Sequence, residues 1–492
     1  MHRFTAVSLT LVACAASAQE SNPDSPALAG AAINYAALHN AEFEGLPESE
    51  RAWPIYAEIQ ALLAPHLRAL RPVQAAQPGD ANWGDAIALL DEIPQLIPLI
   101  EQLRARPTLA WPWADAMPAG WVRAQRGPEA TVREPSPDPL LTDIVLPYAT
   151  TIRTAGTLLR LEALRAAEEG DLDRAIEILE HVPTLARHLQ ETRVTATCVG
   201  AIALQGGVLV QGVLQLTNLS GEALSPDHLD RLNALLDTVT HRKFVTDLIA
   251  DEQSVFADAI DNIYNESDPL GNPQISFAGA GKLMNLSGST VPPDLDPTTD
   301  IPEDKKREAI ARFRTMALSY DESIEGWQRA WDTTAEHAAP PVWEWEGRPA
   351  FEMLRAESRA AAEDSRTLPH LLFVSGYGRI AEFCELLRVQ TDAAYLAVAL
   401  QRFRNETGAW PTALEELVPR WTPTLPADWV DGQPLRYTQR PAGPPAVYSI
   451  GPDGDDDNAS PIPAAAGERY VYPAQREFNP GVIPDGDWVL WP

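Results

Sequence analysis

The chain has little cysteine and little positive charge. Three of its 492 residues are Cys, and 38 are Lys or Arg against 69 that are Asp or Glu. The formal net charge of −31 repels phosphate backbones and anionic lipid head groups, which argues against nucleic acid as a partner. Cys198 and Cys384 lie in apolar helical surroundings, which predicts two buried free thiols; a disulfide in an oxidising compartment is the alternative.

Common catalytic motifs are also missing. The sequence contains no Gly-x-Ser-x-Gly elbow and no His-Glu-x-x-His zinc motif. A stretch around Gly279 has part of a phosphate loop, but Ser276 stands in place of the first Gly and Leu283 in place of the final Ser or Thr. These absences favour a protein that is not an enzyme.

The N-terminus has the pattern of an export signal. His2 and Arg3 are followed by an apolar stretch over residues 4–13 and by Ala16-Ser17-Ala18, a small-residue cleavage site. We therefore expect residues 1–18 to be a signal peptide and the protein to be exported to the periplasm, the cell envelope or the medium. Residues 11–14 also fit a lipobox, and that processing would leave a lipid anchor at Cys14.

A long stretch without charge lies in the middle of the chain. No residue between Arg193 and Glu222 is charged, which raises the question of a membrane span. Glycines and glutamines lower its apolarity, and the segments on both sides are charged and amphipathic. We expect a central helix buried on most faces, whose glycines let neighbouring helices approach, and no transmembrane span in the mature chain.

Periodicity predicts a mainly α-helical protein with a small α+β module at its end. Residues 19–139 form an irregular helical region that ends in a Pro- and Trp-rich connector over 107–139. A helical core domain follows over 140–367, with a long loop at 265–302. Within it, the Gly170-Asp171 break predicts one helical hairpin, because the pattern does not recur at the tetratricopeptide period of about 34 residues. The module occupies 368–492.

The module carries an ordered series of motifs. They are a helix end at 403–408, Trp410-Pro411, a short helix at 414–419, Leu425-Pro426, and the segments 431–437, 447–454 and 486–489. This series resembles the soluble domain of the major pseudopilin of type II secretion systems, over roughly residues 371–492. The resemblance implies a long helix backing a short antiparallel sheet, for which alternation gives strand candidates at 436–439, 446–450 and 487–491.

The position of the module differs from that in the family. Pseudopilins begin with a cleavable leader and a hydrophobic N-terminal helix that packs the filament, whereas this module lies at the far end of a long chain. We therefore expect a reused domain and not a filament subunit.

An acidic loop is the best candidate site. Asp453, Asp455 and Asp457 alternate, so a turning backbone can aim them at one point, and hard oxygen ligands suit calcium. The loop is not an EF-hand, because Asn458 replaces its invariant Gly. The resemblance implies a structural calcium ion that ties Asp453 to Asp487, before the final strand. Local spacing adds Asp455, Asp457 and Asp485; a solvated acidic loop is the alternative.

These features predict an exported, non-enzymatic scaffold or interaction protein of the envelope or medium, with unknown protein partners. The alternative is an exported hydrolase or glycan-binding protein with a Trp-lined cleft between the helical domain and the module, because aromatic faces grip sugars and peptides. That cleft would use Trp343, Trp345 and nearby carboxylates. Two further groups of tryptophans are candidates for the same role or for core anchors. They are Trp111, Trp113 and Trp121, and the pair Trp327 and Trp331.

Overall fold

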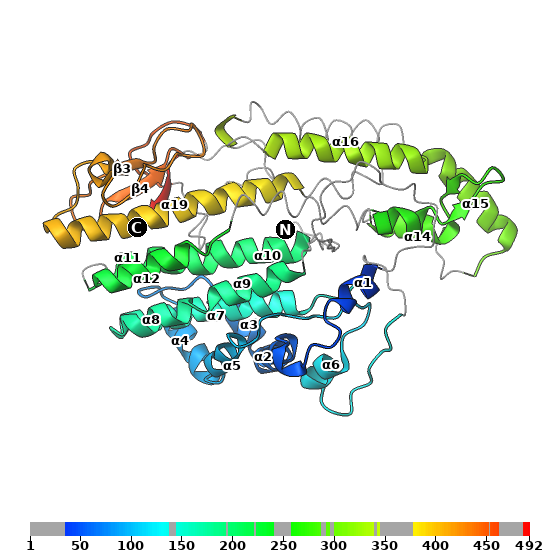
Figure 1. Cartoon of the computed structure of the whole chain (residues 1–492), viewed down its shortest axis with the longest axis horizontal. Coiled ribbons are helices and arrows are strands. Elements are labelled where there is room, and N and C mark those ends of the chain that lie inside the picture. The colour runs from blue at the N-terminus through cyan, green and yellow to red at the C-terminus, as the bar shows by residue number, and fades with distance from the viewer. Residues whose placement is uncertain are drawn as a thin grey trace.

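The protein is mainly helical, with a small antiparallel sheet near its C-terminus, as the sequence predicts (Figure 1). The computed structural model describes residues 35–136, 144–192, 195–220, 223–240, 257–286, 292–295, 300–338, 342–344, 377–451, 453–461 and 486–492. The predicted signal peptide and Cys14 lie outside these residues, as do Trp345 and Asp485.

The N-terminal region consists of short helices. They are α1 (Tyr35–Ala41), α2 (Trp53–Leu63), α3 (Leu67–Leu70), α4 (Trp83–Glu92) and α5 (Leu96–Leu103). The apolar side chains of Ile55 and Ile59 are buried on α2, as their spacing predicts. Pro65 lies in the 3₁₀ turn Ala64–His66 that separates α2 from α3, because a proline lacks the amide hydrogen that would continue the helix.

The connector is ordered but not wholly irregular. The prediction of an irregular segment over 107–139 was wrong at α6 (Ala119–Arg126), whose only buried side chain is Trp121 and which therefore shows no apolar period. Trp111, Trp113 and Trp121 are at most 1% exposed. These three tryptophans are core residues, so their faces are not available to a ligand.

The helical core follows. Its helices are α7 (Tyr148–Glu168), α8 (Leu172–Leu179), α9 (Val182–Glu191), α10 (Thr195–Leu204), α11 (Gln211–Ser220) and α12 (Pro226–Leu236). The α7–α8 hairpin confirms the break predicted at Gly170-Asp171: Gly170 has a φ of 86°, and the Asp171 carboxylate accepts the amide hydrogen of Arg174 at 3.0 Å.

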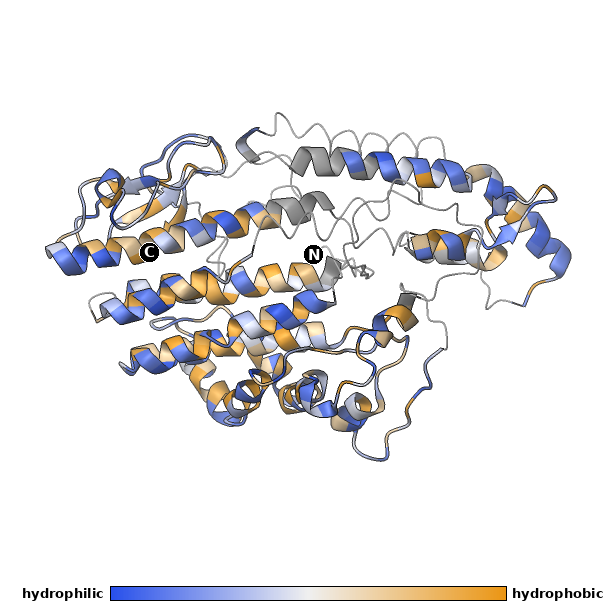
Figure 2. Cartoon of the chain, viewed as in Figure 1, coloured by the Kyte–Doolittle hydropathy of each residue, from blue (hydrophilic) through white to orange (hydrophobic). Residues whose placement is uncertain are grey.

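The uncharged stretch forms one central helix. A π-helical turn, Gln205–Val210, joins α10 to α11, and Figure 2 colours α10 as mostly hydrophobic. In the described part of the chain, Thr197–Ser220 is the one helix long and apolar enough to cross a membrane, and 78% of its most apolar window is buried inside the protein. Burial on most faces is thus confirmed, while the absence of a transmembrane span in the mature chain stays a prediction.

Close packing explains two of the glycines of this helix, Gly206 and Gly212, whereas a Cβ on Gly207 would have nothing within 4 Å. A Cβ on Gly206 would lie 3.1 Å from Oε1 of Gln390, and one on Gly212 would lie 2.9 Å from a methyl group of Leu179. Neighbouring helices therefore approach closely, as predicted. Cys198 and Cys384 are both buried and form no disulfide, as the prediction of two buried thiols expects.

The predicted loop over 265–302 was wrong for its first half. A two-stranded hairpin, β1 (Glu266–Ser267) with β2 (Pro273–Gln274), leads into helix α14 (Phe277–Leu286). Gly279 reads as a helix breaker in the sequence, yet a Cβ there would lie 2.1 Å from the backbone oxygen of Ile263. This glycine serves close packing of a helix. The phosphate-loop fragment consequently lies within α14.

Two longer helices complete the helical part. They are α15 (Glu303–Met316) and α16 (Tyr320–Ala338), and Figure 1 shows them with α14 on the side of the molecule away from α4 and α5. Trp327 on α16 is 6% exposed, so it is a core anchor. The hydroxyl of Tyr264 donates to the backbone oxygen of Leu318 at 2.7 Å, which holds the turn between α15 and α16.

The C-terminal module contains one long helix and three short strands. They are α19 (Tyr377–Thr407), the 3₁₀ helix η6 (Leu414–Leu417), β3 (Arg436–Thr438), β4 (Ala446–Ser449) and β5 (Trp488–Trp491). The strands form an antiparallel sheet in the order β3-β4-β5. Each strand begins and ends within one residue of its predicted bounds.

Helix α19 lies between this sheet and the helical core (Figure 1). The sheet contacts it through β4 and β5, and α11 and α12 contact it from the other side. Its apolar residues from Leu386 to Leu400 are buried accordingly. Polar bonds secure the contact to the core: Gln401 donates to the backbone oxygen of Thr217 at 3.0 Å, and Asn405 donates to that of Leu224 at 2.9 Å.

Candidate metal centre

The acidic loop leaves β4 through a glycine that no other residue can replace without strain. Gly451 has a φ of 68°, and a Cβ there would lie 2.4 Å from the backbone oxygen of Gly486. The chain therefore turns directly against the segment that precedes β5. Residues 453–461 then fold back to the same segment, where Pro461 bridges to Asp487.

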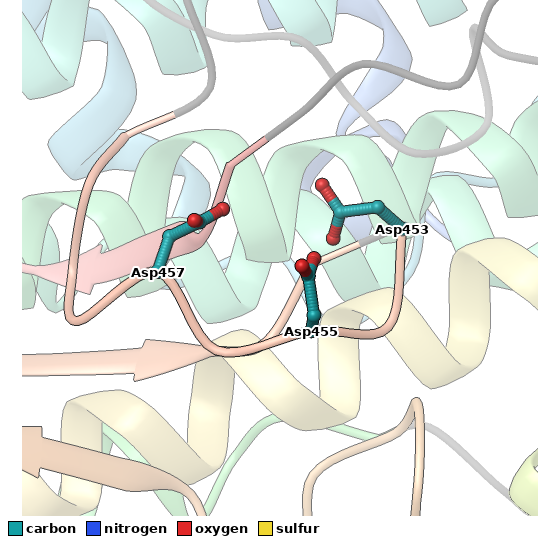
Figure 3. Close-up of side chains that lie close together, drawn as sticks. All are labelled: Asp453, Asp455 and Asp457. Carbon is teal, nitrogen blue, oxygen red and sulfur yellow. The ribbon is translucent and has the colours of Figure 1, made fainter.

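Three of the predicted ligands converge on one point. One carboxylate oxygen from each of Asp453, Asp455 and Asp457 lies within 4.8 Å of the others, and Figure 3 shows the three side chains along the turning loop. Oδ2 of Asp453 accepts the amide hydrogen of Gly486 at 2.7 Å. Its Oδ1 is buried and has no hydrogen-bond partner among the described residues.

Asp487, a further predicted ligand, is a buried acceptor outside the group formed by Asp453, Asp455 and Asp457. The residue is 1% exposed; its Oδ2 accepts the amide hydrogen of Ala459 at 2.6 Å, and its own amide donates to Ser460 at 2.7 Å. Oδ1 has no hydrogen-bond partner among the described residues. Burial raises the pKa of Asp487, and the charges of Asp456 and Asp457 add to that effect.

These residues fit a divalent cation. A buried carboxylate oxygen without a partner is costly. One such oxygen belongs to Asp453, in the loop where negative charge is concentrated, and the other belongs to Asp487, which is hydrogen-bonded to that loop. A calcium ion would satisfy these oxygens and offset the repulsion, since it accepts several oxygen ligands in flexible geometry. Asp485, the fifth predicted ligand, lies outside the described residues.

Two further aspartates position the loop, and neither was predicted. Asp456 accepts from the Tyr448 hydroxyl at 3.0 Å and from the Asn458 amide at 3.0 Å, so it is turned towards the protein. Asp428 is fully buried and accepts from Ser449 Oγ at 2.7 Å and from the Ile450 amide at 3.0 Å, which fixes the end of β4. Burial raises the pKa of Asp428. The sequence signal for the different role of Asp456 is its place in the alternation, between the converging residues Asp455 and Asp457.

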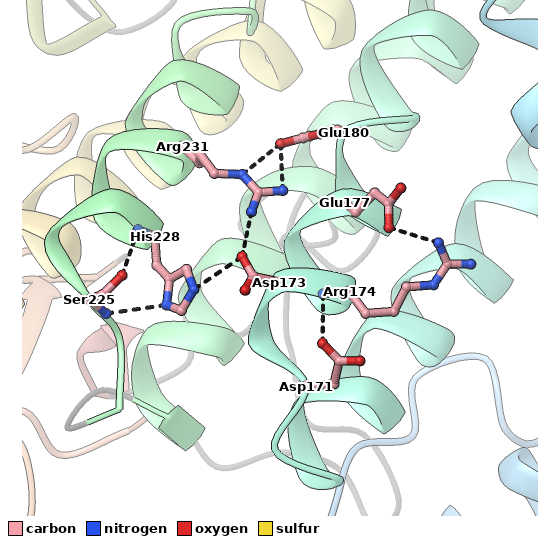
Figure 4. Close-up of polar contacts among 8 residues, drawn as sticks. All are labelled: Asp171, Asp173, Arg174, Glu177, Glu180, Ser225, His228 and Arg231. Carbon is pink, nitrogen blue, oxygen red and sulfur yellow. Dashed lines mark hydrogen bonds and ion pairs between the residues drawn. The ribbon is translucent and has the colours of Figure 1, made fainter.

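A serine, a histidine and an aspartate also meet between α8 and α12 (Figure 4). Nε2 of His228 lies 3.3 Å from Asp173, but Nδ1 accepts the backbone amide of Ser225, and Oγ of Ser225 accepts the backbone amide of His228. The serine hydroxyl is therefore bound to a backbone amide and not to the imidazole. This geometry is a helix capping box.

A cavity lies elsewhere, between α4, α5, α7 and α8. Its volume is about 300 Å³, and its lining is mixed, with Ile93 and Leu158 beside Glu101 and Glu162. The two arginines at its rim are neutralised: Arg165 pairs with Asp91 at 2.8 Å and Arg174 with Glu177 at 2.9 Å. It offers no unpaired charge to an ionic ligand.

Trp343 is the one residue of the predicted Trp-lined cleft that the structure describes. It lies in the short 3₁₀ helix Val342–Glu344, with the Arg388 guanidinium 5.5 Å from its ring centroid. A Cβ on Gly432 would lie 2.8 Å from its ring. Trp343 thus contacts the C-terminal module at α19 and at the loop before β3.

Comparison with known proteins gives no relative from which function can be inferred. No family model matches the chain, and no curated protein or solved structure matches it.

Proposed function

We propose that the protein is an exported, non-enzymatic scaffold or interaction protein with a pseudopilin-like C-terminal module. One observation carries this proposal: α19 is covered on one side by its own sheet and on the other by its own helical core. A helix buried in this way supports reuse of the module as a domain of a larger protein. Over residues 383–407, whose side chains the structure describes, it leaves little apolar surface for packing in a filament.

Calcium stabilises the module in this proposal. Asp453 and Asp487 hold the ion between the acidic loop and the residue before β5, and Asp455 and Asp457 complete its oxygen ligands, with Asp485 as a fifth candidate. The ion supplies fixed positive charge and performs no chemistry. Its role is structural, because the loop joins two strands of a sheet that is only three strands wide.

Two features away from the metal site also favour a binding role. Ser225 and His228 form the cap of α12, and the arginines that line the cavity are already paired. The partners are proteins whose identity is unknown, since a net charge of −31 disfavours nucleic acid. Export follows from the signal at residues 1–18, with lipidation at Cys14 as the alternative mode of processing.

A hydrolase or glycan-binding protein is the second candidate, because Trp343 does lie at the contact between the helical part and the module. The nearest carboxylates on α19 weaken it. Glu385 and Asp392 both pair with Arg388, at 2.9 and 2.7 Å, so neither is poised as a free acid or base.

Thermal unfolding of the mature full-length chain tests the calcium site. Calcium at about 100 times its dissociation constant should stabilise the fold by about 2.7 kcal/mol, and magnesium should not. Asp453→Ala and Asp487→Ala should abolish the shift, whereas Asp85→Ala, an exposed acid on α4, should keep it. The absence of a shift in the parent protein would remove calcium from the proposal.

Cell fractionation and mass measurement of the mature protein test the proposed export and the processing of the N-terminus. A mature N-terminus at Gln19 in the periplasm or medium supports simple export, and a lipidated Cys14 supports an envelope anchor. Recovery of the intact protein in the cytoplasm with residue 1 present would contradict export. Hydrolysis of, or saturable binding to, a glycan that depends on Trp343 would replace the scaffold by the second candidate.

A further inference from the structure

Strand β5 connects the candidate metal centre to the helical core. Asp487 immediately precedes the strand, and its backbone and side chain bind Ser460 and Ala459 of the acidic loop. Trp491, at the other end, donates its indole hydrogen to Oγ1 of Thr217 on α11 at 3.1 Å. The loop and the core are thus joined by four residues of extended chain, about 13 Å at about 3.3 Å per residue.

The core end of this connection is well packed. Trp491 is 1% exposed, and its ring lies 5.8 Å from that of Trp410 in an edge-on contact. Thr217 is fully buried, and its backbone oxygen accepts from Gln401 of α19. The same residue of α11 therefore holds both β5 and α19.

The other end of this connection, at the acidic loop, concentrates negative charge. Asp453, Asp455, Asp456, Asp457 and Asp487 carry five carboxylates, and residues 446–461 and 486–492 contain no Lys or Arg. Asp487 is only 1% exposed, yet its Oδ1 lacks a hydrogen-bond partner among the described residues. Without a cation, the charges of Asp456 and Asp457 repel that of Asp487, the residue before β5.

We propose that the cation in the acidic loop regulates the docking of the C-terminal sheet on the helical core, through β5. With the ion bound, Asp487 is fixed to the loop and Trp491 stays on Thr217. When the ion leaves, the loop and Asp487 separate, and β5 loosens from α11. This inference rests on the calcium site of the proposed function and adds regulation to it.

Hydrogen–deuterium exchange of the mature full-length protein tests the coupling, with calcium and with a chelator. Chelation should speed exchange about tenfold or more in peptides that cover 453–461, 488–491 and 211–220, as expected for local opening, and leave 83–103 unchanged. Calcium binding itself is measured in parallel by titration. Thr217→Val should keep calcium binding and the protection of 453–461, and should make exchange at 211–220 independent of calcium. Trp491→Phe should act in the same way.

The outcomes separate the two claims. If the protein binds calcium and the loop is protected, but exchange at 211–220 is the same with and without the ion, the coupling is overturned and the calcium site stands. If calcium does not bind, both fail. If Asp487→Asn removes calcium binding and raises exchange at 211–220 to the level seen in chelator, the coupling is supported. Faster exchange at 83–103 on chelation would indicate global unfolding and overturn it.

Discussion

The indole Nε1 of Trp491 donates a hydrogen bond to Oγ1 of Thr217 across 274 residues of sequence, at 3.1 Å and without access to solvent. A buried indole that loses its acceptor retains an unsatisfied donor, and this costs more than the bond contributes when present. The pair therefore links the last strand to the core in a way that substitution can measure.

We expect Thr217→Val to lower the free energy of unfolding by about 1–3 kcal/mol, because valine keeps the shape of threonine but removes the acceptor. In a Trp491→Phe background the same substitution should cost about 0.5 kcal/mol or less, since no donor is then left unpaired. Urea unfolding of the four proteins gives both values. Equal costs of Thr217→Val in the two backgrounds would show that the bond contributes nothing.

A second buried pair makes stability depend on pH. The Tyr56 hydroxyl lies 2.8 Å from Nδ1 of His188, and Nε2 lies 3.1 Å from the backbone oxygen of Arg106. A carbonyl oxygen only accepts, so Nε2 carries the proton and Nδ1 accepts from Tyr56. Burial lowers the pKa of His188 from 6.5 to about 4.

Because the folded-state pKa of His188 lies below its unfolded value, the unfolded chain binds this proton first as pH falls. We therefore expect this residue to account for a loss of about 3 kcal/mol of stability between pH 7.5 and pH 4. His188→Gln should remove that part of the pH dependence, since glutamine does not titrate. Tyr56→Phe is the control, because it keeps the imidazole. Identical pH profiles for His188→Gln and the parent would contradict the assignment.

The strands of the module were predictable from local pattern. Alternation and the Gly and Pro residues on each side placed β3, β4 and β5 within one residue, because those signals act over a few neighbouring positions. Helix α14 was missed for the opposite reason. The meaning of Gly279 depends on Ile263, whose backbone fills the space where a side chain would stand, and such a contact leaves no trace in local composition.

The candidate site also combines features that local sequence predicts with features that depend on distant contacts. The spacing of Asp453, Asp455 and Asp457 predicted their convergence, and the resemblance to pseudopilins pointed to Asp487. Nothing in the sequence indicated that Asp487 is buried, since its burial requires the loop to return after β4. Asp428 was also invisible, because its partners Ser449 and Ile450 lie 21 and 22 residues later.

Gly279 also allows a matched test of helix packing. Gly279→Ala should destabilise the protein, because its Cβ would lie 2.1 Å from the Ile263 oxygen and the backbone must move, at a cost of about 1–3 kcal/mol. Gly84→Ala is the control: this α4 position has nothing within 4 Å, so alanine should stabilise the helix by about 1 kcal/mol. Opposite signs in thermal unfolding support the packing of α14 on Ile263. A neutral or stabilising Gly279→Ala would contradict it.

Ser225 distinguishes a helix cap from a nucleophile. Its Oγ accepts the backbone amide of His228 at 3.2 Å, so Ser225→Ala should cost about 1 kcal/mol of stability. Ser225→Asp should recover most of that loss, because aspartate caps helices as well as serine does. Circular dichroism melts of the three proteins measure the effect. If the two variants are equally destabilised, Ser225 is not the helix cap. If both variants abolish a hydrolytic activity while Ser225→Asp stays as stable as the parent, Ser225 acts on a substrate and the non-enzymatic proposal fails.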